Sequence, residues 1–132
     1  MKILYILSLG ILLAVLTVSQ APNLFVYAPV KKEVRPPTDE EVVTEIAHVF
    51  RKEGRHVIVK AILCFYGESG LRYDAVGINK SGSKDGGIAQ INDIHKMSLE
   101  DRLDYKKNIT KAYEIYLNRG KNFNAWYAPS CR

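Results

Sequence analysis

The chain has 132 residues, of which 47% are hydrophobic and 25% are charged. This length suits one domain and this composition suits a packed core, so the sequence is neither a multidomain chain nor an intrinsically disordered one. Nineteen Lys and Arg against fourteen Asp and Glu give a net charge of +5. Such a charge favours contact with nucleic acid, lipid headgroups or bacterial wall polymers, and does not choose among them.

Residues 1–21 have the pattern of a secretory signal peptide. Lys2 precedes an apolar stretch from Ile3 to Val18, and the small residues that a signal peptidase requires follow at 19–21. An uncleaved N-terminal membrane anchor is the alternative, because apolar character resumes at 24–26 and the stretch is only slightly short for a spanning helix. In either case we expect the remaining domain to work outside the cytoplasm, as a secreted or periplasmic protein or one anchored to the membrane by this segment alone.

A linker and a capped helix are expected next. Residues 22–37 are assigned to the linker, because 29–37 contain three prolines and four charges without apolar periodicity. The folded domain then covers residues 38–132. Thr38 and Glu41 have the spacing of a capping box, which predicts that the first helix begins here, and Gly54 is expected to end it.

The rest of the chain divides into two predicted helices and, between them, a region of different composition. Apolar residues at helical spacing predict one helix from about residue 55 to residue 67 and another from about 104 to 119. Residues 71–93 are rich in Gly, Asn and Ser, which indicates turns and short strands. The sequence therefore predicts an α+β fold that is mostly helical and has a small β-rich region.

Two acidic residues are the candidate catalytic groups. Glu68 follows the second predicted helix, where a carboxyl group can be half buried beside a cleft, and desolvation disfavours its charged form so that it can donate a proton. Asp85 lies in a polar turn where solvent, hydroxyls and Lys84 favour the carboxylate. Cleavage of a glycosidic bond needs two carboxyl groups in such contrasting environments, although with fourteen acidic residues the spacing alone is a weak signal.

A two-part motif strengthens this hypothesis. The sequence Gly-Glu-Ser-Gly at 67–70, followed by Asp-Gly-Gly-Ile-Ala-Gln-Ile-Asn at 85–92, resembles the lysozyme-like superfamily, which includes soluble lytic transglycosylases and c-type lysozymes. Further similarity lies in the Asn-Ile pair at 108–109, in Asn-Ala-Trp at 124–126 and in the terminal half-cystine. The resemblance covers about residues 38–132.

The resemblance implies a lysozyme-like fold in which the β-rich region, including a strand within 87–92, forms one wall of a substrate cleft. The implied reaction is cleavage of peptidoglycan glycan strands at the β-1,4 bond between N-acetylmuramic acid and N-acetylglucosamine. Glu68 is the expected proton donor, and Asp85 the expected stabilising or nucleophilic partner, although it could equally be a turn residue. A lytic transglycosylase, which uses one Glu as acid and then base and leaves 1,6-anhydro ends, is the alternative reaction.

The expected ligand is the peptidoglycan strand, bound by a monomer without metal or organic cofactor. A wall-binding module that does not turn over is the alternative of another class. Nucleic acid is not an expected partner, since Lys and Arg are scattered without a recognised motif, and the histidines lack metal-ligand spacing. The candidate substrate-binding residues, for which solvated faces or core positions are the competing interpretations, are Ser69, Gln90, Asn92, Asn108, Tyr113, Tyr116 and Trp126.

Two cysteines in an exported domain predict one disulfide. Cys64 lies one helical turn before Glu68, so a bridge to Cys131 would tie the C-terminal tail to the helix that precedes the candidate acid. A buried, unpaired Cys64 is the alternative.

Overall fold

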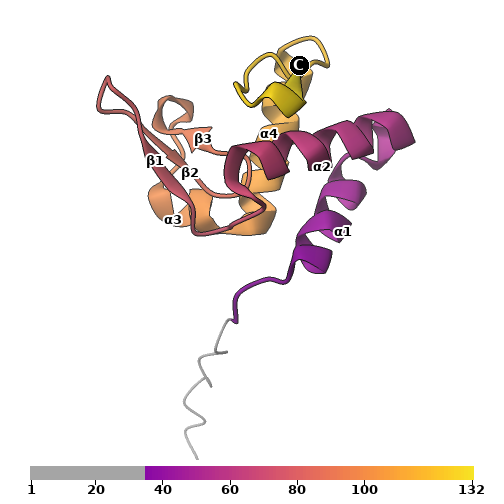
Figure 1. Ribbon diagram of the computed structural model, residues 1–132, viewed down its shortest axis with the longest axis horizontal. Helices are drawn as coiled ribbons and strands as arrows, with labels where there is room; N and C mark the ends of the chain where they lie inside the picture. The colour runs from indigo at the N-terminus through magenta and orange to yellow at the C-terminus, as the bar shows by residue number, and fades with distance from the viewer. Residues whose placement is uncertain (1–34) are drawn as a thin grey trace, which may run out of the picture. The chain divides into compact units, whose positions relative to one another are not determined.

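A computed structural model describes residues 35–132, which form an α+β domain with a small antiparallel sheet (Figure 1). The α+β class and its helical majority agree with the sequence prediction. The predicted signal peptide or anchor and nearly all of the predicted linker lie outside the described residues. Within 35–132 no helix has the length and apolar character needed to cross a membrane. The elements are α1 (Asp39–Val49), η1 (Arg51–Glu53), α2 (Arg55–Ser69), β1 (Val76–Ile78), β2 (Lys84–Gly86), β3 (Ile91–Asn92), η2 (Asp93–His95), α3 (Leu99–Leu103), α4 (Tyr105–Asn118) and η3 (Pro129–Cys131).

Helix α1 begins with the predicted capping box. The Thr38 hydroxyl accepts a hydrogen bond from the Glu41 backbone N–H, and the Glu41 carboxylate accepts one from the Thr38 backbone N–H. Arg35 also donates to Glu41, and this hydrogen bond is the main reason that the pKa of Glu41 is lowered to about 2. The helix ends at Val49 rather than at Gly54. Residues 51–53 form a separate 3-10 turn, and Gly54, with φ +84°, leads into α2.

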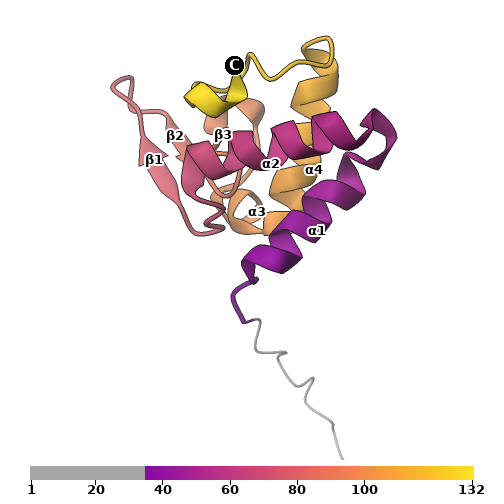
Figure 2. The same cartoon turned by 45° about the vertical axis from the view of Figure 1, so that its right-hand side comes forward.

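Helix α2 continues two residues beyond the predicted end. It stops when Gly70 adopts a left-handed conformation with φ +64°, so Glu68 lies in the last turn of the helix rather than after it. Ala61, Cys64 and Phe65 form the buried face. Figure 2 shows that this C-terminal end of α2 lies next to the sheet, whereas its first turns lie close to α1. The last turn of α2 therefore places Glu68, the candidate acid, beside the sheet.

The sheet is shorter than expected in the segment 87–92. Strand order is β1-β2-β3, and Asp85 on β2 is opposite Gly77 on β1 and Asn92 on β3. Only Ile91 and Asn92 of the predicted strand pair with β2, because residues 87–90 form a turn in which the Gln90 N–H donates to the Gly87 carbonyl. The predicted strand is thus a turn followed by two paired residues.

Helix α4 follows closely the predicted range 104–119, and Asp104 caps its N-terminus. The short helix α3 was not predicted, because five residues give too little apolar periodicity. Phe50 lies between α1 and η1. Its ring contacts Phe65 of α2, Tyr116 of α4 and Phe123 of the C-terminal tail (residues 119–132), so these rings form one core. Trp126 extends this cluster from the tail, and its ring is tilted against those of Phe65 and Phe123.

Candidate active site

A cavity of about 390 Å³ lies between the end of α2, the sheet, the C-terminal part of α4 and the tail. Glu68 and Asp85, the two candidate catalytic residues, both line it. The remaining lining residues are Asn79, Ser81, Ser83, Gln90, Ile91, Asn92, Ile94, His95, Ile115, Arg119, Ala125, Trp126 and Tyr127.

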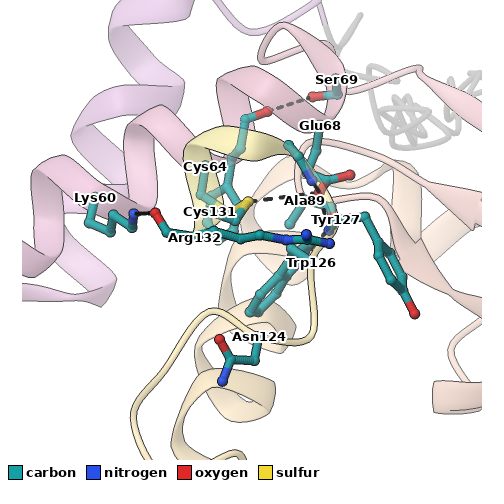
Figure 3. The surroundings of a disulfide bond; sticks show 12 residues. Lys60, Cys64, Glu68, Ser69, Ala89, Asn124, Trp126, Tyr127, Cys131 and Arg132 are labelled. Carbon is teal, nitrogen blue, oxygen red and sulfur yellow. Dashed lines mark hydrogen bonds between the residues drawn. A yellow bond between two sulfur atoms is a disulfide. The ribbon is translucent and has the colours of Figure 1, made fainter.

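Glu68 is held to the C-terminal tail through one carboxyl oxygen. Its Oε1 accepts hydrogen bonds from the backbone N–H groups of Tyr127, at 2.9 Å, and Ala128, at 2.8 Å (Figure 3). The Cys131 sulfur lies 3.8 Å from the same oxygen, and because it belongs to a disulfide it has no proton to donate. Oε2 has no hydrogen-bond partner among residues 35–132 and is not buried. One oxygen is thus fixed, and the other is open to solvent.

The tail reaches Glu68 because of the predicted disulfide. Cys64 and Cys131 form a disulfide with a Cα–Cα distance of 4.4 Å, so the competing interpretation of an unpaired Cys64 is excluded. In the chain-entropy model, closing this loop of 67 residues stabilises the fold by about 4 kcal/mol. The bridge lies one helical turn from Glu68, on the same helix, and therefore fixes the tail where its N–H groups meet the carboxyl group.

Gly67 provides the space for this contact. A Cβ atom at position 67 would lie 2.2 Å from the Ser130 Oγ and 3.0 Å from the Ala128 Cβ, both of which belong to the tail. Any larger residue would push the tail away from the helix, because atoms at such separations repel strongly. Gly67 thus lets the tail approach the helix closely, and the neighbouring Glu68 accepts the hydrogen bonds of the tail.

Asp85 is fixed by side-chain amides rather than by backbone groups. Asn92 donates from Nδ2 to Oδ1 at 2.6 Å, and Asn79 donates from Nδ2 to Oδ2 at 2.8 Å. The Ser83 hydroxyl also accepts from both amides, at 3.1 Å each, so the three residues form one network around the carboxyl group. Since both oxygens of Asp85 already accept an N–H, the residue is arranged as a hydrogen-bond acceptor.

Gln90 and Ser69 are placed differently with respect to the cavity. Gln90 lines the cavity, and its Nε2 donates hydrogen bonds to the carbonyl groups of Ala75 and Gly87. Ser69 does not line it. Its hydroxyl donates to the Ile88 carbonyl at 2.7 Å and so connects the end of α2 to the turn at 87–90.

Besides Ser69, three further predicted substrate-binding residues do not line the cavity, namely Asn108, Tyr113 and Tyr116. Asn108 is fully buried: its Oδ1 accepts from the Ala89 N–H, and its Nδ2 donates to the carbonyls of Gly86 and Arg102. Tyr116 is 3% exposed, within the aromatic core. For these residues the core interpretation describes what the structure shows, because their helical spacing points them at the inner face of α4.

Tyr113 belongs to a polar cluster outside the cavity. Its hydroxyl donates to Glu53 at 2.8 Å, and Lys121 binds the same carboxylate at 3.0 Å. The hydrogen bonds from Lys121 and then Tyr113 lower the pKa of Glu53, and the bond to Glu53 raises the pKa of Tyr113. This cluster binds Lys121, near the start of the tail, to Glu53 of η1.

The tail presents two aromatic residues in succession, of which only the first was predicted. Trp126 lines the cavity, but it is 5% exposed and donates from Nε1 to the Ala89 carbonyl at 2.8 Å. Tyr127 also lines the cavity and is 82% exposed (Figure 3). The two adjacent aromatic residues thus have different roles, because the Trp126 ring belongs to the core and the Tyr127 ring is exposed.

Sequence reasoning also missed the residues that form the far part of the cavity wall. Asn79 and Ser83 were not singled out as partners of Asp85, and nothing marked Arg119 or His95. Burial and the nearby charges of Lys111 and Arg119 lower the pKa of His95. Within residues 35–132 there is no cluster of three or more side chains suited to hold a metal ion.

The sequence matches no protein-family model, and a search of the curated proteins found no significant match.

Proposed function

We propose that this protein has a lysozyme-like domain and cleaves peptidoglycan glycan strands at the β-1,4 bond between N-acetylmuramic acid and N-acetylglucosamine. The observation that carries this proposal is that Glu68 and Asp85, from different elements, line one cavity and are held differently, Glu68 through one oxygen and Asp85 through both. Glycoside cleavage requires one carboxyl group that donates a proton and a second that stabilises positive charge or attacks C1. The hydrogen bonds favour that division of roles.

Glu68 is suited to be the acid because its Oε2 is free. In the proposed step, the proton on Oε2 passes to the departing glycosidic oxygen while the bond from this oxygen to C1 breaks. The carboxylate that remains already accepts two backbone N–H groups at Oε1. Such charge-assisted hydrogen bonds are stronger than neutral ones, and they need no rearrangement at the moment of reaction.

Asp85 is suited to the second role because neither of its oxygens is arranged to donate. Its two amide partners hold the carboxyl group in position on β2. A negative group there stabilises the oxocarbenium-like sugar, or attacks C1 before water completes hydrolysis. We therefore favour hydrolysis over transglycosylation, in which the 6-hydroxyl of the sugar itself replaces water and Glu68 alone acts as acid and base.

The disulfide supports a location outside the cytoplasm, where such bonds persist and where peptidoglycan is found. We propose that the domain acts there as a monomer on glycan strands, without a metal ion or an organic cofactor.

Release of dye-labelled fragments from purified peptidoglycan tests this function. Wild type is expected to release dye. Glu68→Gln, which keeps the size of the side chain but removes the proton donor, is expected to reduce the rate by about 10²- to 10⁴-fold. Glu100→Gln is the matched control, because Glu100 is exposed on α3 and does not line the cavity. If wild type releases no dye and binds peptidoglycan all the same, the protein is a wall-binding module and the enzyme proposal is wrong.

A further inference from the structure

Arg119 is a cavity residue to which the proposed reaction assigns no task. It is the C-terminal capping residue of α4, is exposed, and lines the same cavity as Glu68 and Asp85. Its guanidinium group makes no hydrogen bond or ion pair with any residue of 35–132, whereas the neighbouring Lys111 is paired with Glu114 at 2.8 Å. Arg119 therefore brings an uncompensated positive charge to the cavity wall.

His95 is a second titratable group of the cavity wall on which the charge of Arg119 acts. Burial, and after it the charges of Lys111 and Arg119, lower the pKa of His95. A lowered pKa favours the neutral form of His95, and Arg119 is the cationic residue of this wall. A free guanidinium group with five N–H donors in a planar fork is matched to a carboxylate.

An anionic ligand would need such a group. Glu68 and Asp85 place two carboxyl groups in the cavity, and a negatively charged glycan would be repelled by any charge that they carry. The muramyl sugars of peptidoglycan carry carboxylates, either on the free lactyl ether or on the stem peptide attached to it. Strands made of N-acetylglucosamine alone carry none.

We propose that Arg119 binds a carboxylate on the muramyl side chain, and that the cavity thereby prefers peptidoglycan strands to strands of N-acetylglucosamine alone. This inference rests on the proposed function and names its substrate class. Arg119 acts here as a specificity-determining residue, remote from the proton transfer.

The test measures the binding of three soluble tetrasaccharides to the full chain carrying Glu68→Gln, which prevents cleavage during calorimetry. The first is N-acetylglucosamine only, the second alternates with muramic acid that has a free lactyl carboxylate, and the third also bears stem peptides. Adding Arg119→Ala is expected to raise the Kd of carboxylate-bearing ligands by about fivefold, the effect of losing an exposed ion pair. The Kd of the uncharged ligand is expected to stay within about twofold, since that ligand has no charge for Arg119 to bind.

Two further variants separate specificity from folding. Arg119→Lys keeps the charge and is expected to recover part of the affinity for the charged ligands. Arg55→Ala removes an exposed Arg outside the cavity and is expected to change no Kd. Weakening of only the peptide-bearing ligand assigns the carboxylate to the stem peptide, and weakening of the peptide-free muramyl ligand assigns it to the lactyl group.

Several outcomes would overturn the inference. These are an equal loss of affinity for all three ligands in Arg119→Ala, no loss for any of them, or no binding of either charged ligand. Dye release by wild type reports on the proposed function separately, so a protein that cleaves without an Arg119 preference contradicts only the inference.

Discussion

The two walls of the cavity hold their carboxyl groups by different means. On the tail wall, backbone N–H groups bind Glu68, and a disulfide fixes the backbone that carries them. On the sheet wall, side-chain amides from β3 and from the turn between β1 and β2 bind Asp85. Backbone groups tied by a covalent bond have little freedom, whereas exposed amides can be replaced one at a time. Changes to the tail wall should therefore affect the whole fold, and changes to the sheet wall should affect mainly the site.

The largest effect is expected from loss of the disulfide. Cys64→Ala combined with Cys131→Ala should lower the free energy of unfolding by about 3–4 kcal/mol, because the unfolded chain regains the freedom of a 67-residue loop. Urea denaturation measures this, and dye release should fall as well, since the tail no longer holds Glu68. Reduced wild type should match the variant. A variant as stable as oxidised wild type would show that packing alone places the tail.

The buried hydrogen bonds of Asn108, which belong to the core rather than to either wall of the cavity, should be the next most sensitive feature. Asn108→Ala leaves the Ala89 N–H and the carbonyls of Gly86 and Arg102 without their buried partner, which should cost about 2–3 kcal/mol. Urea denaturation again measures the loss. Asn118→Ala, at an exposed position of the same helix, should change stability little. Equal effects of the two substitutions would mean that the turn does not depend on Asn108.

Gly67→Ala should disturb the tail wall from the helix side. The added Cβ meets Ser130 Oγ at 2.2 Å, so the tail must shift, at a cost of about 2 kcal/mol. The rate of dye release should fall even where the variant is fully folded, because the N–H groups of the tail move away from Glu68. Ser130→Ala in the same chain removes the nearest atom and should recover part of both losses. Full activity in Gly67→Ala alone would argue against tight packing at this point.

Asn79→Ala should affect the sheet wall with a small cost in stability. Asp85 loses one amide donor but keeps Asn92, and the site is exposed, so we expect a change below about 1 kcal/mol in stability. The rate of dye release should fall several-fold, because the carboxyl group loses its fixed orientation. Lys80→Ala, in the same turn, is the control. A loss of stability as large as that of Gly67→Ala would remove the contrast between the walls.

Low pH should lower the stability of the fold by protonating Glu53, which binds Lys121 near the start of the tail. The pKa of Glu53 is lowered below its ordinary 4.5, so its contribution to stability is present above that pH and is lost as pH falls through the lowered pKa. Thermal unfolding between pH 6 and 2 should show wild type losing its advantage over Glu53→Gln in that acidic range. An advantage that persists at the acidic end would show that the charge of Glu53 does not matter.

The sequence predicted the local features better than the long-range ones. The capping box of α1, the long helices and the disulfide follow from spacing, residue type and compartment. The role of Asn108 and the exposure of Tyr127 depend on which distant segments meet. Helical periodicity shows that a side chain faces inward, but not whether it meets a ligand or the core. Arg119 was missed for the same reason, because an exposed cation at a helix end is common unless a cavity lies beside it.

Mass spectrometry of the soluble products from purified peptidoglycan tests the central claim most directly. Wild type should release disaccharide muropeptides cut at C1 of N-acetylmuramic acid, with reducing ends for hydrolysis or anhydro ends for transglycosylation, and Glu68→Gln should release almost none. Products formed at a similar rate by Glu68→Gln, or an absence of glycan cleavage by wild type, would contradict the assignment of Glu68 as the proton donor.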